Sequence, residues 1–125
     1  MARARTPKKV LIVDDDPLVL RILKDRLVEE GYLVSTTSSA FGATQLVEEQ
    51  QPDVVIIDVV LPALPGHRIA ALIRDRMKHV KVILYSAKDA AELAEIARDC
   101  DANGWVVKSD DYDALVAEVQ RLIKK

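Results

Sequence analysis

The alternation of short apolar runs with segments of helical periodicity constrains the fold of this chain more than any other feature. Five runs have β-branched or aliphatic character without helical spacing: residues 10–13, 33–36, 54–57, 80–85 and 105–107. Residues 54–57 are continuously apolar, which is typical of a strand buried on both faces of a parallel sheet. An antiparallel strand with one exposed face would alternate apolar and polar residues. The pattern therefore predicts a parallel sheet.

Segments with helical periodicity separate and follow these runs. In residues 112–123 the apolar side chains form one stripe, as in an amphipathic surface helix. A first helix is expected to begin at Asp16 and Pro17, because aspartate caps free helix amides and proline suits the first helical position. Further helices are expected over residues 41–49, 69–77 and 89–97. Strand and helix thus alternate five times, which predicts one doubly wound α/β sheet with helices on both sides.

Length and charge indicate one domain with a short basic leader. The 125 residues fit a single core, and we expect residues 1–8 to be a flexible basic N-terminus before a domain over residues 9–125. From residue 10 onward the chain carries 20 acidic and 14 basic residues, a net charge of −6. Because that charge repels phosphate backbones, direct nucleic-acid binding by the folded part is not expected.

Hydropathy and cysteine content point to a cytoplasmic protein that does not contact a membrane. No apolar stretch approaches the roughly 18–20 residues that cross a bilayer, and the N-terminus lacks the apolar segment of a secretory signal. The single cysteine, Cys100, has no partner for an internal disulfide, which fits a reducing compartment.

Polar side chains follow four of the five apolar runs. Asp14 and Asp15 follow the first run, Asp58 the third, Ser86 the fourth and Lys108 the fifth. Ligands of open α/β sheets bind beyond the carboxyl ends of the strands, where these residues stand. We therefore expect three carboxylates, a hydroxyl and an ammonium group to converge on one edge of the sheet.

Three neighbouring carboxylates are costly without a cation. Ionised side chains at Asp14, Asp15 and Asp58 repel one another. Lys108 carries one positive charge and balances only one of them. Carboxylate oxygens favour a hard cation such as Mg²⁺, which takes few protein ligands and keeps several waters. The acidic group therefore predicts a Mg²⁺ site.

A divalent cation beside a carboxylate, an ammonium and a hydroxyl is suited to phosphoryl transfer, which depends on positioning and charge neutralisation. A carboxylate can itself be the nucleophile and form an aspartyl phosphate. Asp58 is the best candidate, because it ends the most buried predicted strand. Ser86 and Lys108 would then contact two oxygens of the phosphoryl group.

Four segments contain these residues: 11–17 (LIVDDDP), 58–66 (DVVLPALPG), 85–87 (YSA) and 104–108 (GWVVK). In this order and spacing they resemble the receiver domain of two-component response regulators, and the resemblance spans Lys8 to the C-terminus. It implies a CheY-like, flavodoxin-like sheet of order 2-1-3-4-5 with five helices in three layers. It also implies phosphorylation of Asp58 by a sensor histidine kinase or a histidine phosphotransfer protein.

The resemblance assigns roles to individual residues. Asp15, Asp58 and the backbone carbonyl of Val60 would bind Mg²⁺ directly, and Asp14 would act through water. Such a domain catalyses its own phosphorylation and dephosphorylation and is not a turnover enzyme. In the implied switch, Ser86 moves toward the phosphoryl group and Trp105 rotates inward.

The implied output surface consists of the helix over residues 89–97, the strand over 105–107 and the helix over 112–123. We expect this surface to bind a downstream protein or an output domain, with a homodimer through the two helices as a possibility. Which protein binds there, and whether the chain acts alone or as part of a longer regulator, stays open.

Three positions bear on how such a site would work. Ser109 follows Lys108, where the family usually has proline after a cis bond. Since a non-proline cis bond costs about 2.5–4 kcal/mol, either the surroundings enforce it or the bond is trans and Lys108 is aimed differently. Val60 and Lys88 lie where the family tunes dephosphorylation. We hypothesise slow hydrolysis, because Val60 does not orient water and Lys88 covers the site.

Two other functions are compatible with parts of this pattern. A pseudo-receiver would bind partners without phosphorylation; Ser109 favours it and the complete acidic group opposes it. A haloacid dehalogenase phosphatase needs an Asp-x-Asp-x-Thr/Val pattern, which the Asp-Asp-Asp-Pro-Leu segment at residues 14–18 lacks. His67 and His79 are interpreted as surface helix residues and not as metal ligands.

Overall fold

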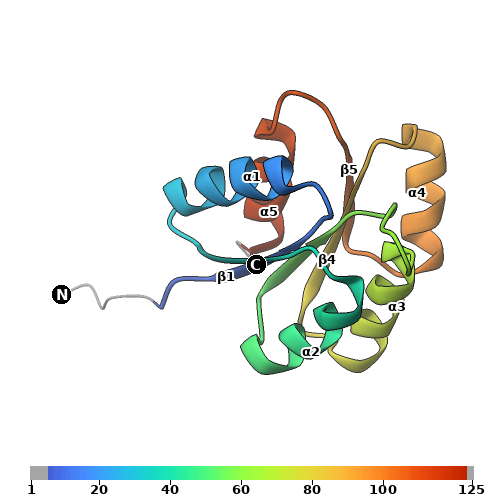
Figure 1. The fold of residues 1–125 in the computed structure, drawn as a ribbon, viewed down its shortest axis with the longest axis horizontal. Helices are drawn as coiled ribbons and strands as arrows, with labels where there is room; N and C mark the ends of the chain where they lie inside the picture. Colours follow the sequence, from blue (N-terminus) through green and yellow to red (C-terminus); the bar gives the residue numbers. More distant parts are fainter. Residues whose placement is uncertain (1–5, 124–125) are drawn as a thin grey trace.

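The computed structural model describes residues 6–123. The strands form one five-stranded sheet, which lies between two groups of helices (Figure 1). The elements in chain order are β1 (Lys9–Val13), α1 (Pro17–Glu29), β2 (Leu33–Thr37), α2 (Ala40–Gln50), β3 (Val54–Ile57), α3 (Gly66–Arg76), β4 (Lys81–Ser86), α4 (Ala90–Asp99), β5 (Gly104–Val107) and α5 (Asp113–Ile123). Residues 1–5 of the predicted basic leader lie outside the described residues.

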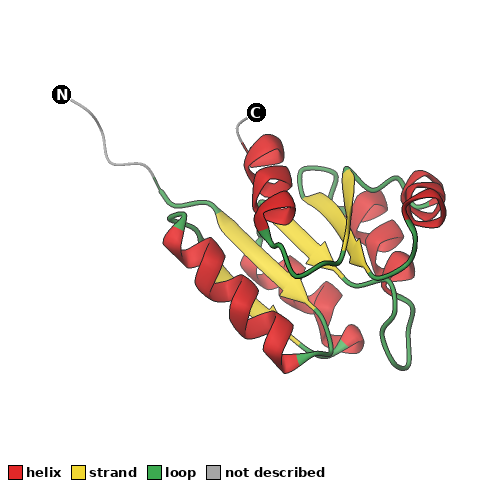
Figure 2. Cartoon of the chain, turned by 90° about the horizontal axis from the view of Figure 1, so that it is seen from above, coloured by secondary structure: helices red, strands yellow, loops and turns green. Residues whose placement is uncertain are grey.

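All strand pairs of the sheet are parallel, and the strand order is β2-β1-β3-β4-β5. Helices α1 and α5 cover one face, and α2, α3 and α4 cover the other (Figures 1 and 2). This architecture confirms the predicted doubly wound fold, its strand order and its five helices. None of the helices within residues 6–123 is long and apolar enough to cross a membrane.

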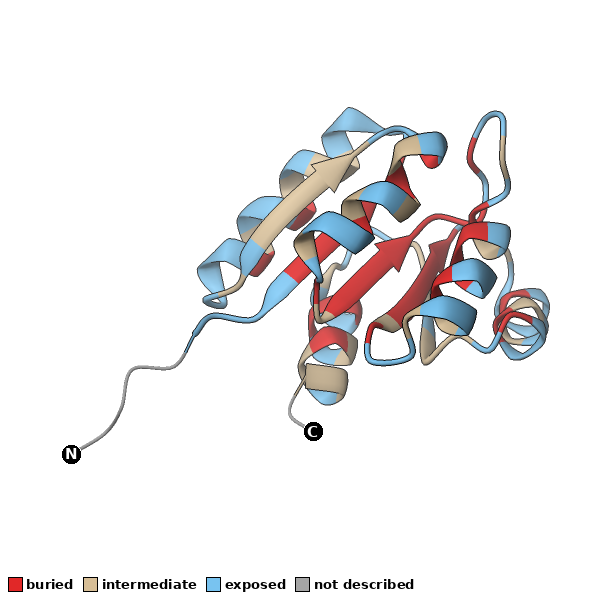
Figure 3. Ribbon diagram, turned by 90° about the horizontal axis from the view of Figure 1, so that it is seen from below, coloured by how far each residue is buried: buried red, intermediate tan, exposed pale blue. Residues whose placement is uncertain are grey.

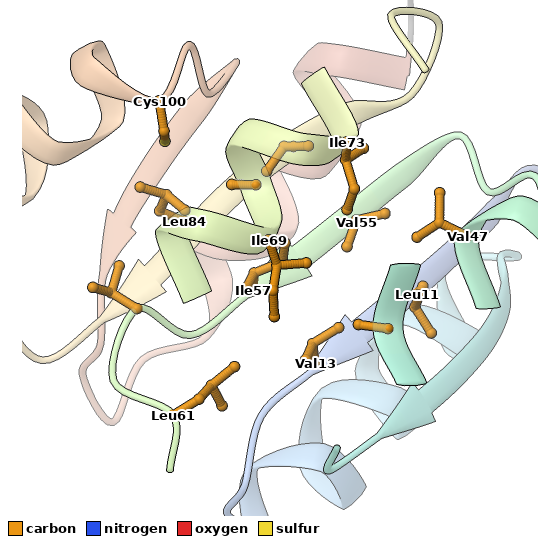
Figure 4. Close-up of a cluster of buried hydrophobic side chains, with 14 of the residues drawn as sticks. Leu11, Val13, Val47, Val55, Ile57, Leu61, Ile69, Ile73, Leu84 and Cys100 are labelled. Carbon is orange, nitrogen blue, oxygen red and sulfur yellow. The ribbon is translucent and has the colours of Figure 1, made fainter. Parts of the chain in front are cut away.

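Alternation along each central strand divides the interior into two cores. Val55 and Ile57 of β3 face α2, α3 and α4, whereas Val54 and Ile56 face α1 and α5. All four residues are buried, as their continuous apolar character predicts (Figure 3). Figure 4 shows the first core, in which Ile57 lies beside Ile69 of α3. Asp58, which follows Ile57, is therefore attached to the best-packed strand.

The helix starts agree with their sequence signals. The Asp16 carboxylate accepts a hydrogen bond of 2.9 Å from the Leu18 amide, and Pro17 occupies the first turn of α1. The Asp89 carboxylate accepts one of 2.9 Å from the Glu92 amide at the start of α4. These caps end the preceding loops, so the residues after β1 and β4 have defined positions.

Element ends differ from the expected bounds by a few residues. Val80 was expected in a strand but lies in a turn, where its amide donates to the Met77 carbonyl over 3.0 Å. His79 lies in the same loop, so its interpretation as a helix residue is wrong. Its ring Nε2 is 2.7 Å from the Gln51 side-chain oxygen. In a turn, backbone amides and carbonyls form hydrogen bonds with near neighbours in sequence. The pattern of apolar residues does not show where such a turn occurs.

Candidate functional site

Strand register brings the first two acidic segments together. Val13 of β1 is paired with Ile57 of β3, and each is the last residue of its strand. The chain continues the pairing for one more residue, because the Asp58 amide donates to the Val13 carbonyl over 3.0 Å. Asp14 and Asp58 therefore leave adjacent strands at the same edge. Both are buried, at 1% and 6% exposure.

Lys108 reaches both of these carboxylates. Its Nζ lies 2.8 Å from Oδ2 of Asp14 and 2.8 Å from Oδ2 of Asp58. The Lys108 amide donates to the Ser86 carbonyl over 2.7 Å, which extends the pairing of β4 and β5 by one residue. All peptide bonds between described residues are trans, including the one before Ser109. A trans bond at this position does not turn Lys108 away from Asp58.

The acidic group has the composition of a hard-cation site. Asp14, Asp15 and Asp58 each offer a carboxylate oxygen, and these oxygens lie within 4.8 Å of one another. Asp15 is exposed, so the group is open to solvent on its side. An all-oxygen set with one accessible member suits Mg²⁺, which binds through one or two carboxylates and retains water.

Backbone amides orient two of the carboxylates. Oδ1 of Asp14 accepts a 2.9 Å bond from the Asp16 amide, and Oδ1 of Asp58 accepts a 3.0 Å bond from the Val60 amide. The other oxygen of each faces Lys108. Oδ2 of Asp14 is buried and has no hydrogen bond of good geometry among the described residues, although the Lys108 ammonium is in ion-pair range. Asp14 thus retains capacity for a further positive partner.

Burial and charge have opposing effects in this group. Burial raises the pKa of Asp14, although the neighbouring Lys108 ammonium and the Asp16 amide lower it. Burial lowers the pKa of Lys108, but the neighbouring carboxylates of Asp14 and Asp58 outweigh it, so the net shift is upward. The Lys108 ammonium thus pairs with two of the three carboxyl groups, and a divalent cation would compensate the excess negative charge.

Ser86 and Lys88 lie at the end of β4 and in the loop after it. Ser86 is fully buried, and its hydroxyl oxygen accepts a 3.3 Å bond from the Lys88 amide. Within residues 6–123 the hydroxyl has no hydrogen bond to the acidic group. The Lys88 ammonium is 3.4 Å from the Glu92 carboxylate. The position of Lys88 over the site therefore stays a hypothesis.

Trp105 and Val60 are exposed, unlike the buried Asp14, Asp58 and Ser86 of the predicted site. Trp105 of β5 is 38% exposed and lines a groove of about 320 Å³ together with Arg98, Glu118 and Arg121. We call these four residues the Trp105 groove. Val60 is 60% exposed, and its amide contacts Asp58. Its carbonyl as a cation ligand stays a prediction.

Two residues shape the site without having been assigned a role from the sequence. A side chain at Gly66, the first residue of α3, would overlap the backbone carbonyl of Asp58. The ring of Tyr85 lies beneath Lys108, with Nζ 5.5 Å from the ring centroid. Strand alternation places Tyr85 on the face toward α1 and α5, but its contact with Lys108 depends on strand order.

His67 is the other histidine of the chain. It lies in α3 as predicted and is half-buried, with a buried Nδ1 that has no partner among the described residues. It does not belong to the acidic group of Asp14, Asp15 and Asp58.

Comparisons with known proteins give the family. Residues 10–120 match the response regulator receiver domain. The transcriptional regulatory protein KdpE of Mycobacterium tuberculosis is 31% identical over 116 residues, which cover 93% of this chain and 51% of that protein. The chain spans about half the length of the curated relatives it matches.

Solved structures agree in sequence and in fold. Response regulator TrrA of Thermotoga maritima, in complex with Mg²⁺ and BeF, is 33% identical, with a TM-score of 0.84 and coverage of 92% of this chain and 98% of that one. Chemotaxis response regulator CheY4 of Vibrio cholerae is 26% identical, with a TM-score of 0.86 and coverage of 94% and 99%. With its doubly wound sheet and the acidic group at the carboxyl edge, the chain belongs to the response regulator receiver domain family of two-component systems.

Proposed function

We propose that this receiver domain accepts a phosphoryl group on Asp58 and responds at the surface formed by α4, β5 and α5. The observation that carries the proposal is the position of Lys108, whose ammonium is 2.8 Å from both Asp14 and Asp58. The Lys108 ammonium lies between two buried carboxylates, so it is placed to pair with a negative oxygen of a phosphoryl group on Asp58. The phosphoryl donor is a phosphohistidine of a sensor kinase or of a phosphotransfer protein.

The residues present fit Mg²⁺. Asp15, Asp58 and the carbonyl of Val60 would hold it directly, with Asp14 acting through water. When bound, Mg²⁺ supplies neutralisation of the charge on the phosphoryl oxygens. The support comes from the three carboxylate oxygens within 4.8 Å and from the buried Oδ2 of Asp14, which lacks a hydrogen bond of good geometry among residues 6–123.

In the proposed transfer, a carboxylate oxygen of Asp58 forms a bond to phosphorus while the bond from phosphorus to the donor imidazole nitrogen breaks. The imidazole nitrogen retains the electron pair. Lys108 pairs with one phosphoryl oxygen, and the Ser86 hydroxyl donates to another. Hydrolysis by water later frees Asp58 and returns inorganic phosphate. The domain thus catalyses its own modification and is not a turnover enzyme.

The proposed response begins at Ser86. When its hydroxyl turns to the phosphoryl group, it leaves the Lys88 amide that it now contacts at 3.3 Å. Space opens behind it, and Trp105 moves inward from its 38% exposed position. The charge added at Asp58 thereby changes the Trp105 groove between α4 and α5. This face binds a downstream protein or an output domain, and a second copy of the chain is the alternative occupant.

The test is the intact mass after incubation with Mg²⁺ and acetyl phosphate, which is an acyl phosphate donor. We expect one phosphoryl adduct in the wild-type domain and none with Asp58→Asn or with EDTA. Asp53→Asn is a matched control. Asp53 is a carboxylate at the amino-terminal ends of the strands, away from the acidic group, and it accepts a hydrogen bond from the Lys9 amide.

Trp105 fluorescence follows the response in the same samples. A change that needs both Mg²⁺ and Asp58 supports the switch. Absence of an adduct, with no Trp105 response to Mg²⁺ or beryllofluoride, would favour the pseudo-receiver. Partner binding that persists undiminished in Asp58→Asn would have the same meaning.

A further inference from the structure

Tyr85 is the aromatic side chain beneath the proposed site. It is the penultimate residue of β4, is 2% exposed and lies in the core that α1 and α5 cover. Its ring centroid is 5.5 Å from Nζ of Lys108. Tyr85 is paired with Val106 of β5, two residues before Lys108, so both side chains project to the same face of the sheet.

The Lys108 ammonium has the Tyr85 ring as a third neighbour besides its two carboxylate partners. Lysine has a flexible four-carbon stem and a point charge, so it does not hold a fixed direction by itself. The residues that follow, Ser109 and Asp111, are exposed and bonded to each other in a local turn. The ring face of Tyr85 therefore borders the ammonium from within the core, while Asp14 and Asp58 contact it from the edge.

We propose that Tyr85 is a positioning residue, whose ring face holds the Lys108 ammonium between Asp14 and Asp58. The consequence for phosphorylation rests on the proposed function. A cation within about 6 Å of an aromatic centroid is attracted by the negative face of the ring, and the attraction grows when the pair is shielded from water. The 5.5 Å distance and the burial of Tyr85 meet both conditions.

The ring acts here, not the hydroxyl group. Burial, together with the neighbouring Tyr112, raises the pKa of Tyr85 to about 12. The phenol is therefore neutral at physiological pH and offers Lys108 no negative oxygen. A phenylalanine ring at this position keeps the same aromatic face, so Tyr85→Phe retains the proposed contact and Tyr85→Leu removes it.

The experiment compares phosphorylation of these variants by acetyl phosphate, followed by intact mass over time. We expect Tyr85→Leu to lower the rate constant about five-fold and Tyr85→Phe to leave it near the wild-type value. Ile83→Ala is the matched control, because Ile83 is fully buried on the same face of the same strand, two residues away. It loses packing of the same core, and its rate is expected to stay near wild type.

A second series keeps the size of the ring. Tyr85→Phe with increasing numbers of ring fluorines weakens the negative ring face with little change in volume. The phosphorylation rate should fall with each fluorine. Equal rates across this series, or equal rates for Tyr85→Leu and Tyr85→Phe, would overturn the proposal.

A measurement without any phosphoryl donor separates this proposal from the proposed function. The ¹⁵N signal of the Lys108 ammonium is expected to shift and broaden in Tyr85→Leu and to stay close to wild type in Tyr85→Phe. If Asp58 is never phosphorylated but this signal behaves as expected, the proposed function fails and the positioning by Tyr85 stands. An unchanged signal in Tyr85→Leu contradicts the positioning, whatever Asp58 does.

Discussion

The strand that leads to Asp58 and the strand that leads to Lys108 have opposite environments. β3 is central, and all of its residues are buried; β5 is at an edge of the sheet, and none of its residues is buried. An interior strand is packed on both faces, whereas an edge strand loses fewer contacts when it moves. We therefore expect the acidic group to be held rigidly and the Trp105 groove to rearrange at lower cost.

The contrast between β3 and β5 indicates how a charge added at Asp58 would affect the Trp105 groove. Asp58 is held by β3, while Lys108 extends from β5 to meet it. We therefore expect a change in the charge of Asp58 to act, through Lys108, on β5 at the edge of the sheet, while β3 stays in place.

Gly66 and Gly104 test the contrast by the same substitution in the two regions. In Gly66→Ala the new methyl group overlaps the backbone carbonyl of Asp58, and we expect a loss of about 3 kcal/mol in the free energy of unfolding. In Gly104→Ala it meets the end of the Glu118 side chain, which can turn away, so we expect a loss of about 1 kcal/mol at most. Urea unfolding followed by circular dichroism measures both. Equal losses would break the contrast.

Val60 tests whether the exposed loop beside Asp58 protects the phosphoryl group. Its side chain is 60% exposed and apolar, so it does not orient a water molecule. We expect Val60→Gln to shorten the lifetime of the phosphorylated domain about tenfold, less than the roughly 10²–10⁴-fold effect of full general acid–base catalysis. Val60→Leu should leave the lifetime unchanged. A wild-type half-life of seconds would contradict the hypothesis of slow hydrolysis.

Asp14 tests the electrostatic state of the rigid region. Burial raises the pKa of Asp14 above its usual 3.8, so ionisation weakens the fold. This cost is absent below pH 3.8, where the carboxyl is protonated both folded and unfolded, and grows as the pH rises toward the raised value. At neutral pH without divalent cations, Asp14→Asn should therefore be more stable than wild type by about 1 kcal/mol.

Thermal unfolding across pH measures this difference, which should disappear on acidification. Added Mg²⁺ should stabilise the wild-type domain more than Asp14→Asn, because a cation that binds only the folded state stabilises it. A variant less stable than wild type at neutral pH would show that the pairing with Lys108 outweighs burial.

Ala63 gives the smallest expected effect. It lies in the loop after Asp58 with φ 72°, in the left-handed region that alanine adopts at a cost. Ala63→Gly removes that cost, while glycine gains freedom in the unfolded chain, so we expect a net stabilisation of about 0.5 kcal/mol. Ala94→Gly, within α4, should instead destabilise by about 1 kcal/mol. A loss in both would mean that the loop stores no strain.

Much of the fold followed from local pattern. The unbroken apolar run at residues 54–57 indicated a strand buried on both faces, and β3 is that strand. Asp16 and Pro17 indicated the start of α1 correctly, because a helix cap depends on residues that are neighbours in sequence. Val80 looked like part of β4 and belongs to a turn, since apolar character reports burial and not which backbone groups are paired.

The candidate site was predictable in its membership and less so in its contacts. Asp14, Asp58 and Lys108 each follow a strand, and parallel strands end at a common edge. Lys108 contacts Asp58 although the peptide bond before Ser109 is trans, and no residue near Lys108 in the sequence predicted this direction of its side chain. The exposure of Trp105 was not predictable either, because a central strand and an edge strand can have the same apolar sequence pattern.

The type of each element, the capped starts of α1 and α4, and the set of polar residues that follow the strands could all be predicted from the amino-acid order. These properties depend on periodicity and on neighbours along the chain, which the sequence states directly. The folded chain was needed to show that Lys108 bridges Asp14 and Asp58, that Tyr85 lies beneath it and that Trp105 faces a groove. Those contacts join residues far apart in the chain, and their distances depend on strand order, register and packing.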